Sequence, residues 1–165
     1  MNIIALESQV GDLLRQRGWY LATAESCTGG LIGHRLTNVP GSSDYYLGGI
    51  IAYANPVKIH TLGVSQRTID LYGAVSRETV IEMARGARIK LSAQIGLSVS
   101  GIAGPGGASP EKPVGLTWIG LSTPDYEQAW SYIWSGDRLQ VKEQTANQGL
   151  KLLVEFLKRD EAFSH

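Results

Sequence analysis

The segment ESCTGG, at positions 25–30, combines residue types that can support two kinds of chemistry. Ser26 and Cys27 are nucleophiles once a neighbouring base or a lowered pKa activates them. Glycines let the backbone approach a ligand closely, and amides at a helix start bind oxyanions or phosphates. A third interpretation is a tight turn in which small residues are simply tolerated. The segment alone leaves all three interpretations open.

A serine nucleophile needs a base, and histidine is the usual one. The two internal histidines, His34 and His60, fall inside predicted helices at positions that do not distinguish them, so the sequence does not favour a Ser/His/Asp triad. A helix start lowers the pKa of a thiol, which would activate Cys27. A lone cysteine, however, is more often a small buried hydrophobic residue. We therefore rank Ser26 above Cys27 as the nucleophile.

Lys58 is the candidate base, in the segment YANPVK at positions 53–58. Asn55 and Pro56 suit the N-cap and the first position of a helix, which would put Lys58 in the first turn, where the helix dipole opposes a positive charge. An unperturbed lysine has a pKa near ~10.4, so a base at neutral pH needs a decrease of about 2–4 units from desolvation or positive neighbours. Two alternatives stay open: a charged lysine that binds an anion, and a solvated surface lysine.

A glycine-rich segment, SGIAGPGG at positions 100–107, closes a predicted buried strand. It has neither the Gly-Lys-Ser/Thr ending of a P-loop nor the spacing of a dinucleotide-binding turn. Ligands of open α/β sheets bind at the carboxyl ends of strands, beside helix starts, and all three segments lie at such junctions. We therefore expect one site built from all three. No spacing of His, Cys and Asp resembles a set of metal ligands.

The composition is that of an ordinary globular protein and excludes several functional classes. Among 165 residues, fifteen Lys and Arg balance fifteen Asp and Glu, so no net charge attracts nucleic acid or an anionic membrane. The single cysteine excludes an intrachain disulfide framework and CxxC-type metal sites. No apolar run reaches the ~18 residues of a membrane span, and the N-terminal segment does not have the layout of a signal peptide. We therefore expect a cytoplasmic protein.

The remaining patterns predict helices alternating with strands, in one domain over residues 1–165. Apolar residues at helical spacing and capping residues predict helices at 4–17, 28–39, 55–64, 65–73, 76–92 and 137–158. Short apolar runs predict strands at 19–25, 48–53 and 93–100, and a hairpin from 116–123 and 126–134 around Pro124-Asp125. This order indicates an α/β protein, a three-layer α/β/α sandwich with a mixed, mostly parallel sheet.

Five segments together resemble the CinA carboxyl-terminal domain family, over positions 5 to 157. They are TAESCTGGLIG, GGIIAYANPVKIHTLGV, YGAVSRETVIEMARGAR, SVSGIAGPGGASPEKPVGLTW and GDRLQVKEQT. The resemblance implies a nicotinamide-nucleotide amidase, which hydrolyses the carboxamide of nicotinamide mononucleotide to nicotinate mononucleotide and ammonia in pyridine nucleotide salvage. It implies no metal and no cofactor, a small-molecule partner in place of nucleic acid or membrane, and a homo-oligomer. Larger relatives carry an amino-terminal domain, whose activity we do not transfer to this chain.

The resemblance also implies roles for individual residues. Ser26 is the expected nucleophile and Lys58 its base, with Tyr53 as a hydrogen-bond partner or proton relay. The expected substrate-binding residues are Cys27, Thr28, Gly29, Gly30, Ser100, Gly101, Ala103, Gly104 and Arg138. Among them, the amides of residues 28–30 suit an oxyanion or a phosphate, residues 100–104 form a wall, and Arg138 suits the phosphate because a guanidinium can grip it with two hydrogen bonds.

One position departs from the family pattern, because Ala108 stands where relatives often have a third glycine after Gly-Pro. This change could stiffen the loop and shift substrate preference. An alternative function also stays open: a non-catalytic module that binds nucleotides or proteins, since the family is associated with competence and DNA-damage responses.

Overall fold

A computed structural model describes residues 3–161 of the chain. It contains six α-helices and five strands within that range. The helices are α1 (Leu6–Arg17), α2 (Leu31–Thr37), α3 (Asn55–Leu62), α4 (Gln66–Tyr72), α5 (Arg77–Lys90) and α6 (Arg138–Glu161). The strands are β1 (Leu21–Glu25), β2 (Tyr46–Ile51), β3 (Ile95–Gly101), β4 (Leu116–Ser122) and β5 (Glu127–Ile133), and a short 3₁₀ turn covers Ser42–Asp44.

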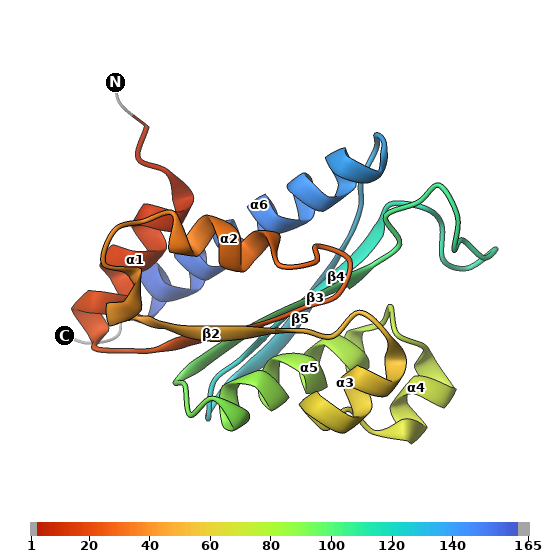
Figure 1. Cartoon of the computed structure of the whole chain (residues 1–165), viewed down its shortest axis with the longest axis horizontal. Helices are drawn as coiled ribbons and strands as arrows, with labels where there is room; N and C mark the ends of the chain where they lie inside the picture. Colours follow the sequence, from red (N-terminus) through yellow and green to blue (C-terminus); the bar gives the residue numbers. More distant parts are fainter. Residues whose placement is uncertain (1–2, 162–165) are drawn as a thin grey trace.

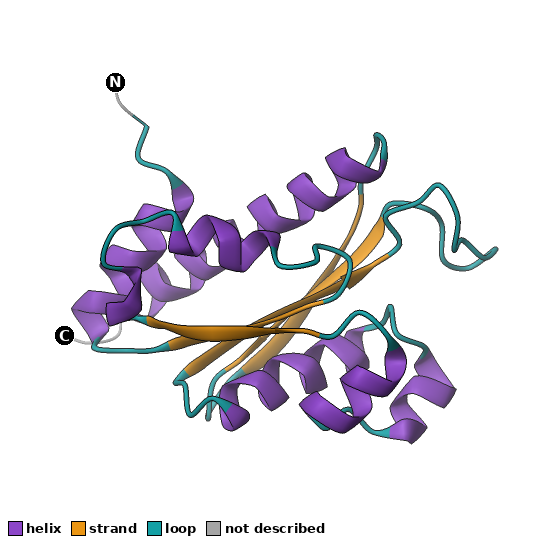
Figure 2. Cartoon of the chain, in the orientation of Figure 1, coloured by secondary structure: helices purple, strands orange, loops and turns teal. Residues whose placement is uncertain are grey.

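The strands form one mixed sheet between two layers of helices, which confirms the predicted sandwich. Its strand order is β2-β1-β3-β4-β5. Strands β2, β1 and β3 pair in parallel, β4 is antiparallel to β3, and β5 is antiparallel to β4, so four of the five strands point the same way. Helices α1, α2 and α6 cover one face, and α3, α4 and α5 cover the other (Figures 1 and 2).

The hydrophobic core lies on both faces of the sheet. Every residue of β1 is buried, and its side chains alternate between the faces, with Leu21 on the side of α1 and α6 and Ala22 on the side of α3 and α5. Leu153 of α6 and Met83 of α5 are fully buried in the two layers. Because β1 and β3 are central, their carboxyl ends have a rigid foundation.

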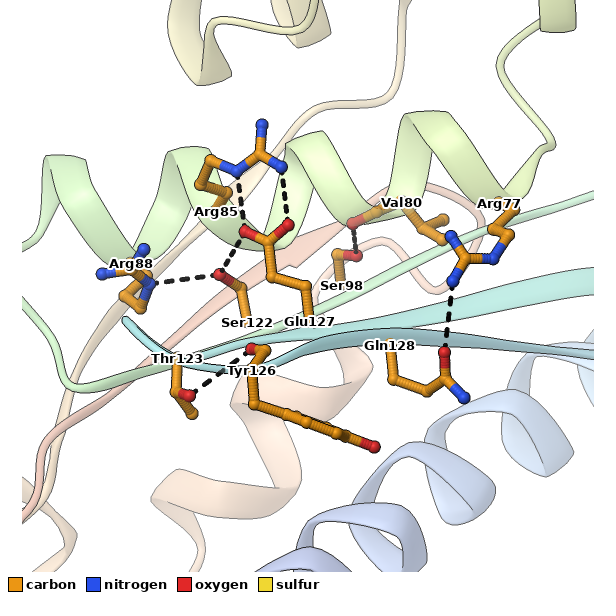
Figure 3. Close-up of polar contacts among 10 residues, drawn as sticks. All are labelled: Arg77, Val80, Arg85, Arg88, Ser98, Ser122, Thr123, Tyr126, Glu127 and Gln128. Carbon is orange, nitrogen blue, oxygen red and sulfur yellow. Dashed lines mark hydrogen bonds and ion pairs between the residues drawn. The ribbon is translucent and has the colours of Figure 1, made fainter.

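Polar contacts attach α5 to the β4–β5 hairpin (Figure 3). The Arg85 guanidinium donates two hydrogen bonds to the carboxylate of Glu127, at 2.7 and 2.6 Å. Arg88 donates to Ser122, whose hydroxyl in turn donates to Glu127. A paired Arg–carboxylate geometry is more specific than a single contact, so this group fixes the register of the helix against the hairpin.

Most predicted elements are present, but two helix starts differ from the expectation. Helix α2 begins at Leu31 and not near Thr28, because Gly29 and Gly30 have positive φ angles of 60° and 104° that end the turn before the helix. Asn55 is not the N-cap of α3. Ala54 takes that position with an extended backbone, and its carbonyl accepts the amides of Val57 and Lys58.

Candidate active site

The three predicted junctions meet at one cavity of about 230 Å³, beyond the carboxyl ends of β1 and β3. The two strands pair in parallel, with Glu25 opposite Val99, so the segments that follow them lie side by side. The cavity is lined by Ser26, Cys27, Tyr53, Asn55, Lys58, Ala74, Val75, Ser100, Gly101, Ile102, Ala103, Gly104, Gly106, Gly107 and Arg138. The structure therefore brings together nine of the twelve predicted site residues, counted within this lining.

Ser26 is the first residue after β1 and is held by the backbone on both sides. Its amide donates to the carbonyl of Val99 in β3 at 3.1 Å, and its carbonyl accepts the amide of Gly29 at 3.1 Å. The side chain is buried at the floor of the cavity. The position of its hydroxyl is thus fixed by the two central strands.

Lys58 is fully buried, with 1% of its surface exposed, and its ammonium nitrogen lies 3.0 Å from the hydroxyl oxygen of Ser26. Nζ also donates to the carbonyls of Ala52 and Tyr53, at 2.9 and 3.0 Å. Burial lowers the pKa of Lys58 to about 8. The surface-lysine alternative is therefore wrong.

The environment of Lys58 also suits a neutral amine. A neutral amine has two N–H donors and one lone pair, and carbonyl oxygens can only accept hydrogen bonds. The carbonyls of Ala52 and Tyr53 can take both N–H groups, which leaves the lone pair for the hydroxyl of Ser26. This arrangement is the one a base needs in order to accept the proton of Ser26.

Cys27 is buried beside Ser26, and burial raises the pKa of its thiol to about 12. A thiol with this pKa is protonated at neutral pH and is a poor nucleophile. Its sulfur packs against Gly101, where an added Cβ would lie 3.2 Å from the sulfur and 2.6 Å from the hydroxyl of Thr117. Both facts favour the ranking of Ser26 above Cys27 and a packing role for the thiol.

Thr28, Gly29 and Gly30 are the three predicted residues that do not line the cavity. The hydroxyl of Thr28 donates to the carboxylate of Glu25 at 2.6 Å, away from the cavity. The same carboxylate accepts the amides of Ile32 and Gly33, at 2.9 and 3.0 Å, and so occupies the amino end of α2. The structure thus places the acid of this chain where the sequence suggested a bound anion.

Tyr53 and Arg138 meet at the mouth of the cavity. The Arg138 guanidinium donates to the hydroxyl of Tyr53 at 2.9 Å and to the carbonyl of Gly104 at 2.8 Å. Tyr53 contacts Lys58 through its backbone carbonyl and not through its hydroxyl, and its side chain is 62% exposed. This contact gives the hydroxyl of Tyr53 a place beside Arg138 in the described structure, while its role as a relay stays a prediction.

A reciprocal cap explains why Arg138 faces this cavity. The side chain of Asp137 accepts the amide of Gln140 at 2.9 Å, and the side chain of Gln140 accepts the amide of Asp137 at 2.8 Å. This capping box fixes the first turn of α6, whose first residue is Arg138. The helix thus begins within one residue of the predicted start at Asp137.

The wall formed by residues 100–104 lies opposite Ser26, as predicted. Ser100 is buried, and its hydroxyl donates to the carbonyl of Ala74 at 2.8 Å, which joins β3 to the segment before α5. Gly104 has a φ of 84°, and an added Cβ there would lie 2.5 Å from the side chain of Val114. Glycine at 104 is therefore required by both the backbone conformation and the close contact.

Several residues of the site were not predicted from the sequence. Ala74 and Val75 belong to the segment YGAVS, which carried the family resemblance but received no role. Glu25 belongs to the segment ESCTGG, yet only the folded chain shows that its carboxylate supports the turn after Ser26. An acid four residues before a pair of glycines was the available signal.

Metal clusters and membrane spans are both absent from the part of the chain that the structure describes. Among residues 3–161, no group of three or more His, Cys, Asp or Glu side chains is placed to hold a metal ion. Within this range, no helix has the length and apolar character needed to cross a bilayer.

Comparison with known proteins establishes the family. The profile of the CinA C-terminal domain matches residues 3–157. A relative from Halothermothrix orenii, named as a putative competence-damage inducible protein, is 51% identical over 155 residues, which are 93% of this chain and 38% of the relative. The chain belongs to the CinA C-terminal domain family. This finding confirms the resemblance seen in the sequence.

Other members of the CinA family agree in sequence and in fold. A CinA-like protein from Chloroherpeton thalassium is 47% identical over 92% of this chain and 37% of its own length, so the chain spans well under half of such curated relatives. A CinA superfamily protein from Klebsiella pneumoniae has a crystal structure with a TM-score of 0.90 and 30% identity, covering 93% of this chain and 96% of that one. A competence/damage inducible protein from Agrobacterium tumefaciens gives a TM-score of 0.86 at 34% identity, covering 96% and 99%.

Proposed function

We propose that this CinA-family domain hydrolyses the carboxamide of nicotinamide mononucleotide, giving nicotinate mononucleotide and ammonia for pyridine nucleotide salvage. The reaction class rests on one observation, the buried contact of 3.0 Å between Nζ of Lys58 and the hydroxyl oxygen of Ser26. The choice of substrate rests on the family resemblance and on the cationic residue Arg138 at the cavity.

In the first half of the proposed reaction, the hydroxyl oxygen of Ser26 attacks the carboxamide carbon while Lys58 accepts the hydroxyl proton. The amide of Cys27 directly follows the nucleophile and has no oxygen acceptor among residues 3–161, so it can donate to the developing oxyanion. Lys58 then returns its proton to the carboxamide nitrogen, the C–N bond breaks, and ammonia leaves. An ester of Ser26 remains.

In the second half, a water molecule attacks the ester carbon and gives a proton to Lys58. The C–O bond to Ser26 then breaks, and the proton passes back to the serine oxygen as nicotinate mononucleotide departs. The same lysine serves as base and then acid in each half, which requires a pKa near the working pH. The pKa of about 8 at Lys58 meets this requirement.

The decisive experiment is ammonia release from nicotinamide mononucleotide by the purified chain, compared with its Ser26→Ala variant. Wild-type protein should release one ammonia per nicotinate mononucleotide formed, and the variant should lose at least about 100-fold in kcat with an unchanged circular dichroism spectrum. Absence of turnover by folded wild-type protein that still binds the mononucleotide would instead favour the alternative, a non-catalytic nucleotide-binding module.

A further inference from the structure

Arg138 alone is an incomplete site for a phosphate. Both of its terminal nitrogens already donate to protein oxygens, one to the carbonyl of Gly104 and the other to the hydroxyl of Tyr53. A phosphate monoester carries nearly two negative charges at neutral pH, and charge-assisted contacts from more than one donor bind it best. The site therefore needs a further cation close to Arg138.

Lys142 lies one helical turn after Arg138, on the same face of α6. Its side chain is half-buried, and among residues 3–161 it has neither an ion pair nor a hydrogen bond. Its ammonium nitrogen approaches the turn after the nucleophile, since an added Cβ on Gly29 would lie 3.9 Å from it. An unpaired cation held in this place carries the cost of partial desolvation without a compensating contact from the protein.

A second relation places Lys142 on the side of the turn that faces Cys27. Burial dominates the pKa of the Cys27 thiol and raises it, while the positive charge of Lys142 acts in the opposite direction. Cys27 and Arg138 both line the cavity, so Lys142 stands beside the rim segment between them. Glycine at position 29 keeps this approach free of a side chain.

We propose that Lys142 and Arg138 together form a subsite for the phosphate of a nucleoside monophosphate, with Lys142 as the cation that the protein leaves unpaired. This inference rests on the proposed function, because it assigns the subsite to the phosphate of the mononucleotide. It also assigns Gly29 a role that the cavity lining did not reveal, which is to leave the ammonium group of Lys142 accessible. The carboxamide would then lie at Ser26 and the phosphate at the opposite end of the substrate, near the start of α6.

The kinetic test compares nicotinamide mononucleotide with nicotinamide riboside, which lacks the phosphate. Lys142→Ala should lower kcat/KM for the mononucleotide about tenfold or more, mainly through KM, because it removes one charge-assisted contact. The same variant should leave the riboside reaction within about twofold of wild type, and Lys142→Arg should restore most of the mononucleotide reaction. Lys151→Ala, at an exposed position on the same helix, is the matched control and should change neither reaction.

A binding test separates this inference from the proposed function. Chemical-shift titration of the whole chain with ribose 5-phosphate, and with ribose as the uncharged control, reads the subsite without turnover. We expect ribose 5-phosphate alone to shift resonances around Arg138 and Gly29, and Lys142→Ala to weaken this binding several-fold. Equal binding by wild type and Lys142→Ala, or equal loss of both kinetic reactions, would overturn the proposal. Binding that depends on Lys142 in a chain without amidase activity would uphold the subsite and reject the proposed reaction.

Discussion

At the scale of single residues, the site depends on a contact between a hydroxyl and a buried amine. Lys58 has three possible partners, and two of them are carbonyls that cannot donate a hydrogen bond. A charged Lys58 can satisfy all three, whereas a neutral Lys58 must receive the hydrogen of Ser26. The two states are close in free energy at neutral pH because burial has lowered the pKa to about 8.

The first prediction concerns the pH dependence that follows from this lysine. The reactive form is the neutral amine, whose fraction increases with pH up to the pKa and is constant above it. We therefore expect kcat/KM for nicotinamide mononucleotide to increase about tenfold per pH unit below a pKa of about 8 and then to level off. Initial rates between about pH 5.5 and 9.5 measure this profile. A rate that is flat across pH 8 would reject Lys58 as the base.

The second prediction distinguishes a base from a fixed positive charge. Lys58→Arg keeps the charge but cannot deprotonate in this pH range, so its activity should fall about 100-fold or more, nearly as far as that of Lys58→Ala. If Lys58 only attracted an anion, arginine would restore much of the rate and keep the pH profile of wild type. Steady-state kinetics on both variants, with circular dichroism as the check on folding, decide between these roles.

The third prediction concerns Cys27, whose thiol has a pKa of about 12 because it is buried. Cys27→Ala should retain kcat within a few-fold of wild type, because a protonated thiol takes no part in the attack and the side chain mainly packs beside Gly101. Ammonia release and labelling with a thiol reagent in the native state are the measurements. Rapid labelling of the native thiol, or complete loss of turnover in a folded variant, would make Cys27 the nucleophile instead.

At the scale of elements, the short turn between β1 and α2 is supported from inside by Glu25. Its carboxylate accepts two amides of α2 and the hydroxyl of Thr28, so the turn that carries Ser26 is tied to both the strand and the helix. The sequence predicted the strand, the turn and the helix from their apolar spacing. It could not predict this support, because an acid at a strand end is usually solvated and only tertiary contacts show where its oxygens point.

The fourth prediction compares this support with an ordinary helix cap. Glu25→Gln replaces one acceptor oxygen by an amide donor facing the backbone amide of Gly33, which should cost about 1–3 kcal/mol of unfolding free energy and also lower kcat. Ser65→Ala removes the cap of α4, outside the cavity lining, and should cost about 1 kcal/mol without changing kcat. Urea unfolding and kinetics of the two variants test the contrast. A Glu25→Gln variant with wild-type kcat would show that the carboxylate supports folding alone.

At the scale of the whole molecule, the parallel pairing of β1 and β3 explains how much of the site the sequence revealed. Strands that end at the same edge bring their following segments together, so the order of residues was enough to assign ESCTGG and SGIAGPGG to one site. Arg138 could be assigned to it only through the family resemblance, because its position depends on the path of α6 across the sheet. The contacts of Tyr53 and the exclusion of Thr28 from the cavity depend on side-chain directions, which periodicity does not determine.

The fifth prediction follows from this assembly. Ser26 is bound to β3 through Val99, Lys58 to the end of β2 through Ala52, and Arg138 to the segment after β3 through Gly104. Since each contact joins different segments of the chain, the active geometry requires the complete sheet, and small domains unfold as cooperative units. Urea titrations followed by far-UV circular dichroism, by tryptophan fluorescence and by residual ammonia release should therefore coincide. A lower urea midpoint for activity than for circular dichroism would contradict this expectation, and it would show that the segments around the cavity open before the sheet does.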